Sequence, residues 1–294
     1  MAGAGGFIGS WICGSLSRAG HEIVGHVRSE KGDITPNSIP VESEVVVNAA
    51  GRLGGHGGDT DSLTASNEAL PKLLGDFCRS GERNLIHIST PGVTGLRADA
   101  KETDEYDPWG DYERTKMRGE KALLEGCGLS AEQLTILRPD FVYGPGDMHK
   151  YPLFFRAAGG WFPLIGSGSA RLRPTYAADV CSAVEASLPE GPLSGGIYNI
   201  GGPEVVSFRE LVRTISEVME VRTRLVPVPR MLFRIALKLG PLRPSSLSES
   251  RFRLFGEDHF VSITKAVEAG FSPRWSLRGG IGKTVEWYRE EGVL

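Results

Sequence analysis

Tyr112 and Lys116, four positions apart at the start of a predicted helix, are the residues best suited to acid–base chemistry. That spacing puts the phenol and the ammonium on one face of the helix, a turn apart. A free phenol has a pKa near ~10 and is a poor base at neutral pH. A neighbouring ammonium would stabilise the phenolate. The pair therefore predicts proton transfer at a substrate oxygen.

A second set of hydroxyl groups, Ser89-Thr90, follows the apolar run 85–88 upstream of this helix. A short buried run predicts a strand, and a hydroxyl at its carboxyl end can bind the reacting oxygen opposite the tyrosine. His87 lies within the run and is predicted to be a packed core histidine. His56, in a glycine-rich segment, is predicted to be an exposed loop histidine.

Glycines at positions 3, 6 and 9 open the chain, in the segment Gly3-Ala4-Gly5-Gly6-Phe7-Ile8-Gly9. Such glycines let the backbone turn tightly, approach a pyrophosphate and seat a helix close to a sheet. The amino terminus of that helix offers free N–H groups and a positive dipole end to the phosphates. The motif predicts a dinucleotide site, provided that a strand precedes it.

Only Met1 and Ala2 precede Gly3, so the first strand is apparently missing. In a doubly wound sheet this strand is central, and its loss would leave a slot about two strand spacings, ~9–10 Å, wide. We therefore expect a chain truncated at its start. A form extended upstream by about six to ten apolar residues is expected to be more stable and to bind dinucleotide more tightly.

Arg28 follows the next predicted strand, 22–27, where an acidic residue would accept hydrogen bonds from the adenosine ribose. A guanidinium at this point can instead pair with a 2′-phosphate. The residue favours NADP over NAD as the cofactor and leaves NAD open.

The elements that must position these residues alternate between short apolar runs and helical patterns. This order predicts an α/β fold with a doubly wound, Rossmann-like parallel sheet. Residues 1–140 are predicted to form a dinucleotide-binding domain, and 141–294 mainly a smaller, interleaved α/β substrate subdomain over the carboxyl edge of the sheet. The predicted strands are 22–27, 44–49, 84–89, 134–137 and 197–200, and the predicted helices are 9–18, 61–79, 111–125, 177–187, 207–219, 230–239, 264–269 and 277–290.

The composition bears on partners and location. The net charge is −3 with both signs mixed, which leaves no electrostatic footprint for nucleic acid. The four cysteines are far apart and the six histidines lack ligand spacing, so neither a disulfide nor a metal is predicted. No membrane span is predicted, and Met231–Leu242 is interpreted as a helix packed on its own domain in preference to one on a membrane surface. We expect a cytoplasmic protein that binds a small molecule, with a homodimer left open.

Short segments typical of one enzyme family run along nearly the whole chain. They are Gly3–Gly9, Asp33-Ile34, 48–50, Asn67, Ser89-Thr90, Tyr112 with Lys116, 138–139, 142–147, Asp179-Val180, 198–202 and 287–288. With them the chain resembles the extended short-chain dehydrogenase/reductases, the NAD-dependent epimerase/dehydratase family. The family's usual tyrosine in its V-Y-G segment is Thr94 here.

The resemblance implies an enzyme in which Thr90, Tyr112 and Lys116 carry catalysis, with NAD or NADP as cofactor. It places Asp33 near the adenine. Together with the motifs above, it leads to a predicted set of cofactor contacts: Gly3, Gly6, Phe7, Ile8, Gly9, Arg28, Asp33, Ile34, Asn48, Ala49, Ala50, Asn67, Tyr112, Lys116 and Pro139.

Three departures from the family's patterns bear on the substrate. Thr90 is not followed by the Asp-Glu pair of members that dehydrate nucleotide sugars, so 4,6-dehydratase activity is not expected. Phe141 stands where many nucleotide-sugar enzymes have an asparagine. Leu172 stands where they often have an arginine for the diphosphate, although Arg171 or Arg173 could substitute.

Three functions therefore stay open. The first is hydride transfer at a carbinol or carbonyl carbon of a nucleotide sugar, as in an epimerase or ketoreductase. The second is an NADP-dependent dehydrogenase or reductase of the hydroxysteroid or dihydroflavonol type, favoured by the apolar Phe141 and by Arg28. The third is a non-catalytic dinucleotide-binding scaffold, although such relatives typically lose the tyrosine or the lysine, and this chain keeps both.

Overall fold

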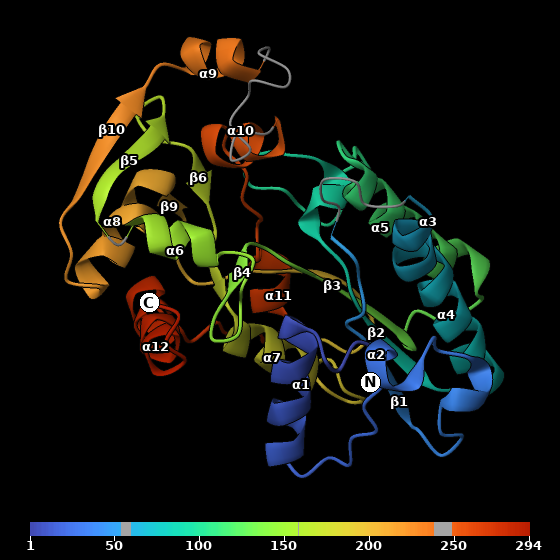
Figure 1. Ribbon diagram of the computed structural model, residues 1–294. Coiled ribbons are helices and arrows are strands. Elements are labelled where there is room, and N and C mark those ends of the chain that lie inside the picture. The colour runs from blue at the N-terminus through green and yellow to red at the C-terminus, as the bar shows by residue number, and fades with distance from the viewer. Residues whose placement is uncertain (54–59, 158, 238–248) are drawn as a thin grey trace.

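The computed structural model describes residues 1–53, 60–157, 159–237 and 249–294. At its centre is a parallel sheet with strand order β1-β2-β3-β8 (Figure 1). The register aligns Asn48 with His87 and His87 with Ile136, so the carboxyl ends of the strands meet at one edge. The predicted α/β class with a parallel sheet is confirmed. The strands are β1 (Val45–Asn48), β2 (Asn84–Ile88), β3 (Leu134–Pro139) and β8 (Gly196–Ile200).

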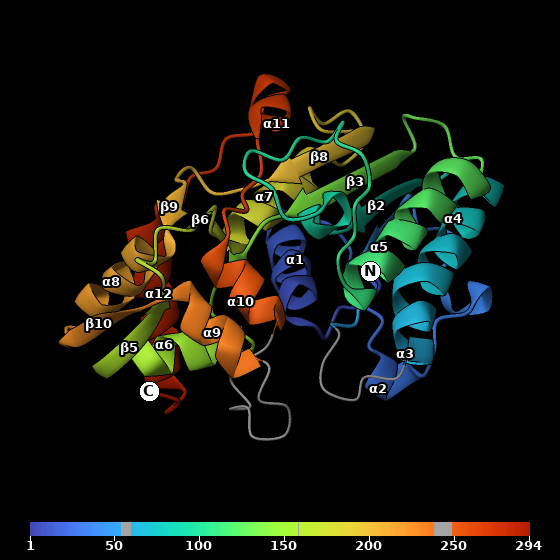
Figure 2. The same ribbon diagram turned by 90° about the horizontal axis from the view of Figure 1, so that it is seen from above.

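Helices cover both faces of this sheet (Figures 1 and 2). Since successive strand residues point to opposite faces, Val47 and Ile86 pack toward one layer, whereas Val46 and Leu85 pack toward the other. The first layer consists of α1 (Phe7–Arg18) and α7 (Ala177–Ala186), and the second consists of α3 (Thr60–Thr64), α4 (Leu70–Ser80) and α5 (Asp111–Lys121). One-turn π-helical segments, Ala65–Ala69 and Ala122–Gly126, interrupt the two long helices predicted there.

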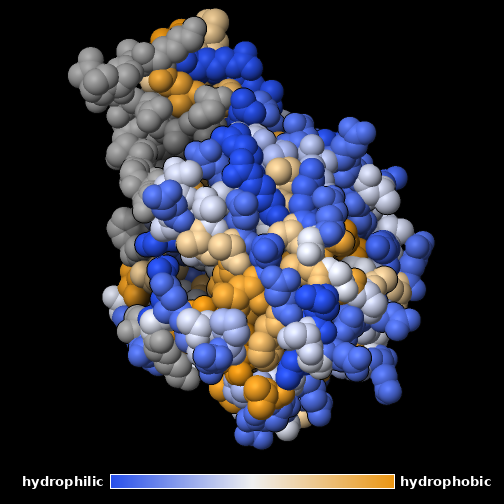
Figure 3. Space-filling view, turned by 90° about the vertical axis from the view of Figure 1, so that its right-hand side faces the viewer, coloured by the Kyte–Doolittle hydropathy of each residue, from blue (hydrophilic) through white to orange (hydrophobic). Residues whose placement is uncertain are grey.

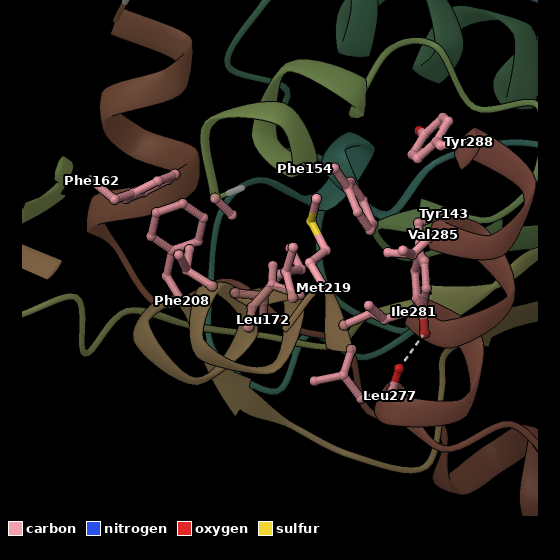
Figure 4. Packing of buried hydrophobic residues seen from close by; sticks show 14 of the residues in the cluster. Tyr143, Phe154, Phe162, Leu172, Phe208, Met219, Leu277, Ile281, Val285 and Tyr288 are labelled. Carbon is pink, nitrogen blue, oxygen red and sulfur yellow. Dashed lines mark hydrogen bonds between the residues drawn. The ribbon is translucent and has the colours of Figure 1, made fainter. Parts of the chain in front are cut away.

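A C-terminal lobe lies beside the sheet, built around a second parallel pair, β5 and β10, that the sequence did not predict (Figure 1). Its core is aromatic and aliphatic, and the Tyr143 hydroxyl donates to the Leu277 carbonyl at 3.3 Å (Figure 4). The elements of the lobe are α6 (Tyr151–Ala157), β5 (Gly160–Ile165), α8 (Phe208–Val218), β10 (Thr223–Val228), α9 (Arg230–Leu237), α10 (Glu249–Gly256) and α12 (Leu277–Glu290).

Short elements connect the two parts of the molecule. The pair β4–β7 is parallel and the pair β6–β9 is antiparallel. The short helix α11 packs on β8. These elements are β4 (Val142–Tyr143), β6 (Arg171–Leu172), β7 (Thr175–Tyr176), β9 (Val206–Ser207), α2 (Arg28–Lys31) and α11 (Thr264–Glu268).

The amino terminus lies between β1 and the segment 22–27. Ala2 forms single parallel bridges to His26 and to Asn48, and its N–H donates to the Val47 carbonyl at 2.8 Å. A cavity of about 370 Å³ lies beside Met1, lined by both neighbouring segments. The prediction of a regular strand over 22–27 is wrong, since within this segment only His26 forms a bridge. A parallel strand needs a continuous neighbour, and Ala2 pairs with this segment at one position only.

The surface of the molecule carries both hydrophilic and apolar side chains. The side that carries α3, α4 and α5 is mostly hydrophilic, with apolar side chains in smaller groups (Figure 3). None of the described helices is long and apolar enough to cross a bilayer. All four cysteines are free thiols, and three of them are buried.

Candidate active site

The glycine loop at the start of the chain is closely packed against the end of β1. Gly3 has φ +77°, and a Cβ on it would lie 2.6 Å from the Ala50 nitrogen. A Cβ on Gly9 would lie 1.9 Å from the Gly3 carbonyl oxygen, so neither position accepts a side chain without a backbone shift. Helix α1 begins after Gly6, which provides no side-chain cap, so the first-turn N–H groups stay open to an anion. These features fit the phosphates of a dinucleotide.

Asn48 holds the turn that follows β1. Its Oδ1 accepts from the Ala50 N–H at 3.1 Å, and its Nδ2 contacts the His87 Nδ1 at 3.1 Å. Both side chains are fully buried. Burial, together with the nearby Lys116 charge, holds the pKa of His87 well below its ordinary value. A neutral His87 accepts the Asn48 hydrogen bond and keeps this turn in place beneath the candidate cofactor site.

Asn67 connects the same loop to the helix of the catalytic pair. Its Oδ1 accepts from the Arg52 N–H at 2.9 Å. Its Nδ2 donates to the Arg52 carbonyl and to the Thr115 Oγ1, both at 3.0 Å. Since Thr115 precedes Lys116, this buried amide positions α5 against the loop after β1.

The structure brings the three predicted catalytic residues together at the carboxyl edge of the sheet. Tyr112 and Lys116 lie one turn apart on α5, and the Lys116 Nζ donates to the Ile88 carbonyl at 2.7 Å. Thr90 follows β2, and its hydroxyl lies close enough to the Tyr112 phenol to affect the pKa of that phenol. The Lys116 Nζ also lies close to Gly51, in the loop after β1. Lys116 thus bonds to the end of β2 and lies beside the loop that follows β1.

Burial shifts the pKa values of Lys116 and Tyr112 in opposite directions. It lowers the pKa of Lys116 to about 8, against the opposing effect of the Glu120 charge. It raises the pKa of Tyr112, as does the Glu113 charge, while the nearby Thr90 hydroxyl lowers it. The phenol is therefore protonated at neutral pH. In this state it is a proton donor, and it would need a further positive charge nearby to act as a base.

A buried ion pair that the sequence analysis did not single out supports α5 from behind. The Arg138 Nε and Nη2 donate to the two Glu120 carboxylate oxygens at 3.0 and 2.6 Å. The Tyr106 hydroxyl donates to the same carboxylate at 2.9 Å. Glu120 and Arg138 are fully buried, so they tie α5 to β3. The available signal was an acid four residues after Lys116 together with an arginine directly after the predicted strand 134–137.

The predicted adenosine end is formed by exposed groups. The Arg28 Nε pairs with the Asp33 Oδ1 at 2.6 Å. Ile34 packs against the core cluster that contains Ala2 and Val46. Arg28 and Asp33 therefore share one place beyond the glycine loop, where the ribose of a bound dinucleotide would reach. His56 lies outside the described residues.

The predicted substrate side is aromatic. Phe141, with φ +33°, follows β3, and its ring meets the Phe255 ring edge to face at 6.5 Å. Phe255 stacks on Phe208 at 4.4 Å. The Lys150 ammonium lies 4.9 Å from the centre of the Phe141 ring. Thr94, at the family's usual tyrosine position, is buried and donates to the Pro91 carbonyl at 3.0 Å.

The two arginines beside Leu172 are engaged within the protein. Leu172 is fully buried in the core of the C-terminal lobe (Figure 4). Arg171 forms an ion pair with Asp258 at 2.8 Å. Arg173 donates to the carbonyls of Val261 and Gly202 at 3.0 and 2.9 Å.

The buried carboxyl of Asp140 should make the stability of the fold depend on pH. It is buried after β3, and burial raises its pKa to about 6, against the opposing charge of His259. A native pKa above the unfolded value of ~3.9 means that the ionised carboxyl destabilises the fold. The loss of folding stability is absent below about pH 4, grows between about pH 4 and 6, and is constant above about pH 6.

Asp140→Asn should therefore be more stable than the wild type at about pH 8, by about 1–3 kcal/mol, and should lose this gain at about pH 4. Urea unfolding at both pH values measures the difference. An equal effect at both pH values would mean that the carboxyl does not titrate in this range.

Residues 1–201 match the family described as the NAD dependent epimerase/dehydratase family. The chain belongs to this family. Together with the Rossmann-like fold and the site above, the match defines an NAD-dependent enzyme of the extended short-chain dehydrogenase/reductase type, an oxidoreductase or epimerase.

Particular relatives differ in the reactions that their names state. The 2-alkyl-3-oxoalkanoate reductase of Stenotrophomonas maltophilia is 29% identical over 243 residues, which cover 73% of each chain. The 3beta-hydroxysteroid-dehydrogenase/decarboxylase isoform 1 of Arabidopsis thaliana is 29% identical over 233 residues, covering 70% of this chain and 53% of that one. Among solved structures, the UDP-glucuronic acid 4-epimerase of Bacillus cereus in complex with NAD has a TM-score of 0.75 at 20% identity, covering 99% of this chain and 98% of that one. This last likeness shows the fold alone.

Proposed function

We propose that this enzyme reduces the carbonyl group of an apolar substrate, with the dinucleotide as hydride donor. The observation that carries the proposal is the substrate side of the site. Phe141 lies there, and its ring packs against Phe255, which stacks on the buried Phe208 of the lobe core. The arginines nearest to the family's diphosphate position, Arg171 and Arg173, are already engaged by protein groups. An apolar ketone needs no cation to bind, whereas a nucleotide diphosphate does.

The proposed roles follow from the contacts. When bound at the glycine loop, the nicotinamide dinucleotide supplies the hydride. Thr90 and Tyr112 hold the substrate oxygen between their hydroxyl groups, and the Tyr112 Oη donates its proton to that oxygen as negative charge develops there. Lys116, fixed by the Ile88 carbonyl, contributes positive charge that stabilises the phenolate left behind. The raised pKa of Tyr112 suits this donor role.

A substrate panel tests the proposal. Initial rates with NADH and NADPH are to be compared for 2-alkyl-3-oxo acids, a 3-oxosteroid and UDP-sugars. We expect turnover of at least one apolar ketone and none of the UDP-sugars. Turnover of UDP-sugars alone would overturn the proposal.

The second candidate is a nucleotide-sugar epimerase, the function placed first on the sequence. Its support is the family itself and the fold shared with the Bacillus cereus epimerase. The cofactor that co-purifies distinguishes the two, because an epimerase regenerates its cofactor internally. Tightly held NAD favours the epimerase, and exchangeable NADPH favours the reductase. Absence of turnover with every substrate would favour a dinucleotide-binding scaffold.

The choice of cofactor is proposed to depend on Arg28, with NADP preferred. Arg28→Asp replaces a partner of the 2′-phosphate by a repelling charge beside Asp33. We expect NADPH affinity to fall at least ~10-fold, the effect of about 1.4 kcal/mol, and NADH affinity to change much less. Fluorescence titration with both cofactors measures this. Arg278→Asp, at an exposed arginine paired with Glu217, is the control. Equal loss for both cofactors would make Arg28 a surface residue without a role in the choice.

A further inference from the structure

An exposed apolar surface lies on α9 in the C-terminal lobe. Met231, Leu232 and Ile235 are 68%, 51% and 52% exposed. Helical spacing places them on the outer side of α9. The inner side carries Phe233, whose ring lies 6.4 Å from that of Phe252 on α10. The helix is thus attached to the lobe by one side, and its apolar outer side faces away from the protein.

The charge around this surface is positive. Helix α9 carries Arg230 and Arg234 and no acidic residue, in a protein of net charge −3. Both residues are exposed. Among the described side chains, neither pairs with a carboxylate.

Other groups hold these arginines in place. The Arg230 guanidinium donates to the Gly256 carbonyl. The Arg234 guanidinium lies 5.9 Å from the centre of the Phe252 ring. Since carbonyls and rings do not neutralise a guanidinium, the positive charge stays available to an anionic partner.

We propose that α9 docks on an anionic lipid bilayer. The side chains of Met231, Leu232 and Ile235 enter the headgroup region, and the neighbouring arginines pair with lipid phosphates. A helix that combines an apolar side with Arg residues lies in the plane of such an interface. A nucleic acid would leave the apolar side uncovered, and a second copy of this surface would oppose arginines to arginines.

This contact places a bilayer near Phe141 on the substrate side of the site. Helix α10 packs on α9 through Phe252 and reaches Phe141 through Phe255. Only the width of α10 therefore separates the proposed bilayer contact on α9 from Phe141, so an apolar substrate would travel a short way from the bilayer to the site. This consequence rests on the proposed function, whereas vesicle binding itself does not.

Co-sedimentation of the intact protein with vesicles tests the docking. We expect binding to phosphatidylcholine vesicles that contain phosphatidylglycerol, weaker binding to phosphatidylcholine alone, and weakening by added salt. The variant Met231→Ser/Leu232→Ser/Ile235→Ser should lower the partition coefficient at least ~10-fold. The control Leu124→Ser/Val267→Ser removes apolar side chains that are 44% and 47% exposed elsewhere, and it should bind like the wild type. Melting curves establish that both variants are folded.

Three results would overturn the docking. One is a wild type that does not bind the anionic vesicles. Another is a triple variant, folded, that binds them as well as the wild type. The last is concentration-dependent dimerisation in ultracentrifugation that the triple variant abolishes without any effect on vesicle binding. Ketone turnover in detergent-free buffer is measured separately, so failure of the docking and failure of the proposed reaction are distinguishable.

Discussion

Tyr112→Phe is expected to lower kcat at least ~100-fold, the usual scale for the loss of one acid–base group. The substitution removes only the hydroxyl, whose pKa the neighbouring Thr90 hydroxyl lowers. The ring, the helix and the glycine loop stay in place, so dinucleotide affinity should stay near that of the wild type. Steady-state rates and cofactor titration on the same preparation measure both quantities.

Tyr198→Phe is the matched control for this substitution. Tyr198 is a buried tyrosine on β8, with the Lys265 ammonium 4.7 Å from the centre of its ring. It lies outside the catalytic group, and its loss of a hydroxyl should leave kcat unchanged. Near-wild-type turnover in Tyr112→Phe would remove Tyr112 from the mechanism. An equal loss in both variants would indicate a structural effect.

Glu120→Ala is expected to lower the free energy of unfolding by about 3–5 kcal/mol, because it leaves the buried Arg138 guanidinium without its counter-charge. The Tyr106 hydroxyl loses its acceptor in the same change. Since Glu120 lies on the catalytic helix, activity should also fall where the variant remains folded. Urea unfolding followed by circular dichroism measures the stability.

Two further variants separate charge from packing. Glu217→Ala breaks an exposed pair with Arg278 and should cost no more than about 1 kcal/mol. The double variant Glu120→Leu/Arg138→Met removes both buried charges and should regain much of the stability lost in Glu120→Ala. If Glu120→Ala costs no more than Glu217→Ala, the buried pair has no special role in the fold.

Local pattern was enough to predict which side chains meet at the edge of the sheet. The 3.6-residue period of a helix places Tyr112 and Lys116 on one side, whatever the rest of the chain does. Parallel strands end at a common edge, so Thr90, which follows β2, had to lie near that edge. The glycines at 3 and 9 reflect a steric demand that only a residue without Cβ meets, and the structure places backbone atoms at both positions.

Contacts between distant segments were beyond such patterns. The pairing of β5 with β10 joins residues 160–165 to 223–228, and nothing in either segment alone specifies the other. The segment 22–27 has the composition of a strand, yet a strand forms only where a neighbour supplies hydrogen bonds along its length, and Ala2 supplies one bridge.

Electrostatics also depended on the tertiary structure. The sequence suggested a Tyr112 phenolate stabilised by Lys116, but the pKa of a group depends on how far it is buried and on which charges the fold brings near it. In the folded protein, burial raises the Tyr112 pKa and lowers that of Lys116. Likewise, Arg171 and Arg173 looked free for a diphosphate until folding brought Asp258 and the Val261 carbonyl against them. Residue type and spacing determine which groups are present, whereas burial and long-range partners determine their charge and availability.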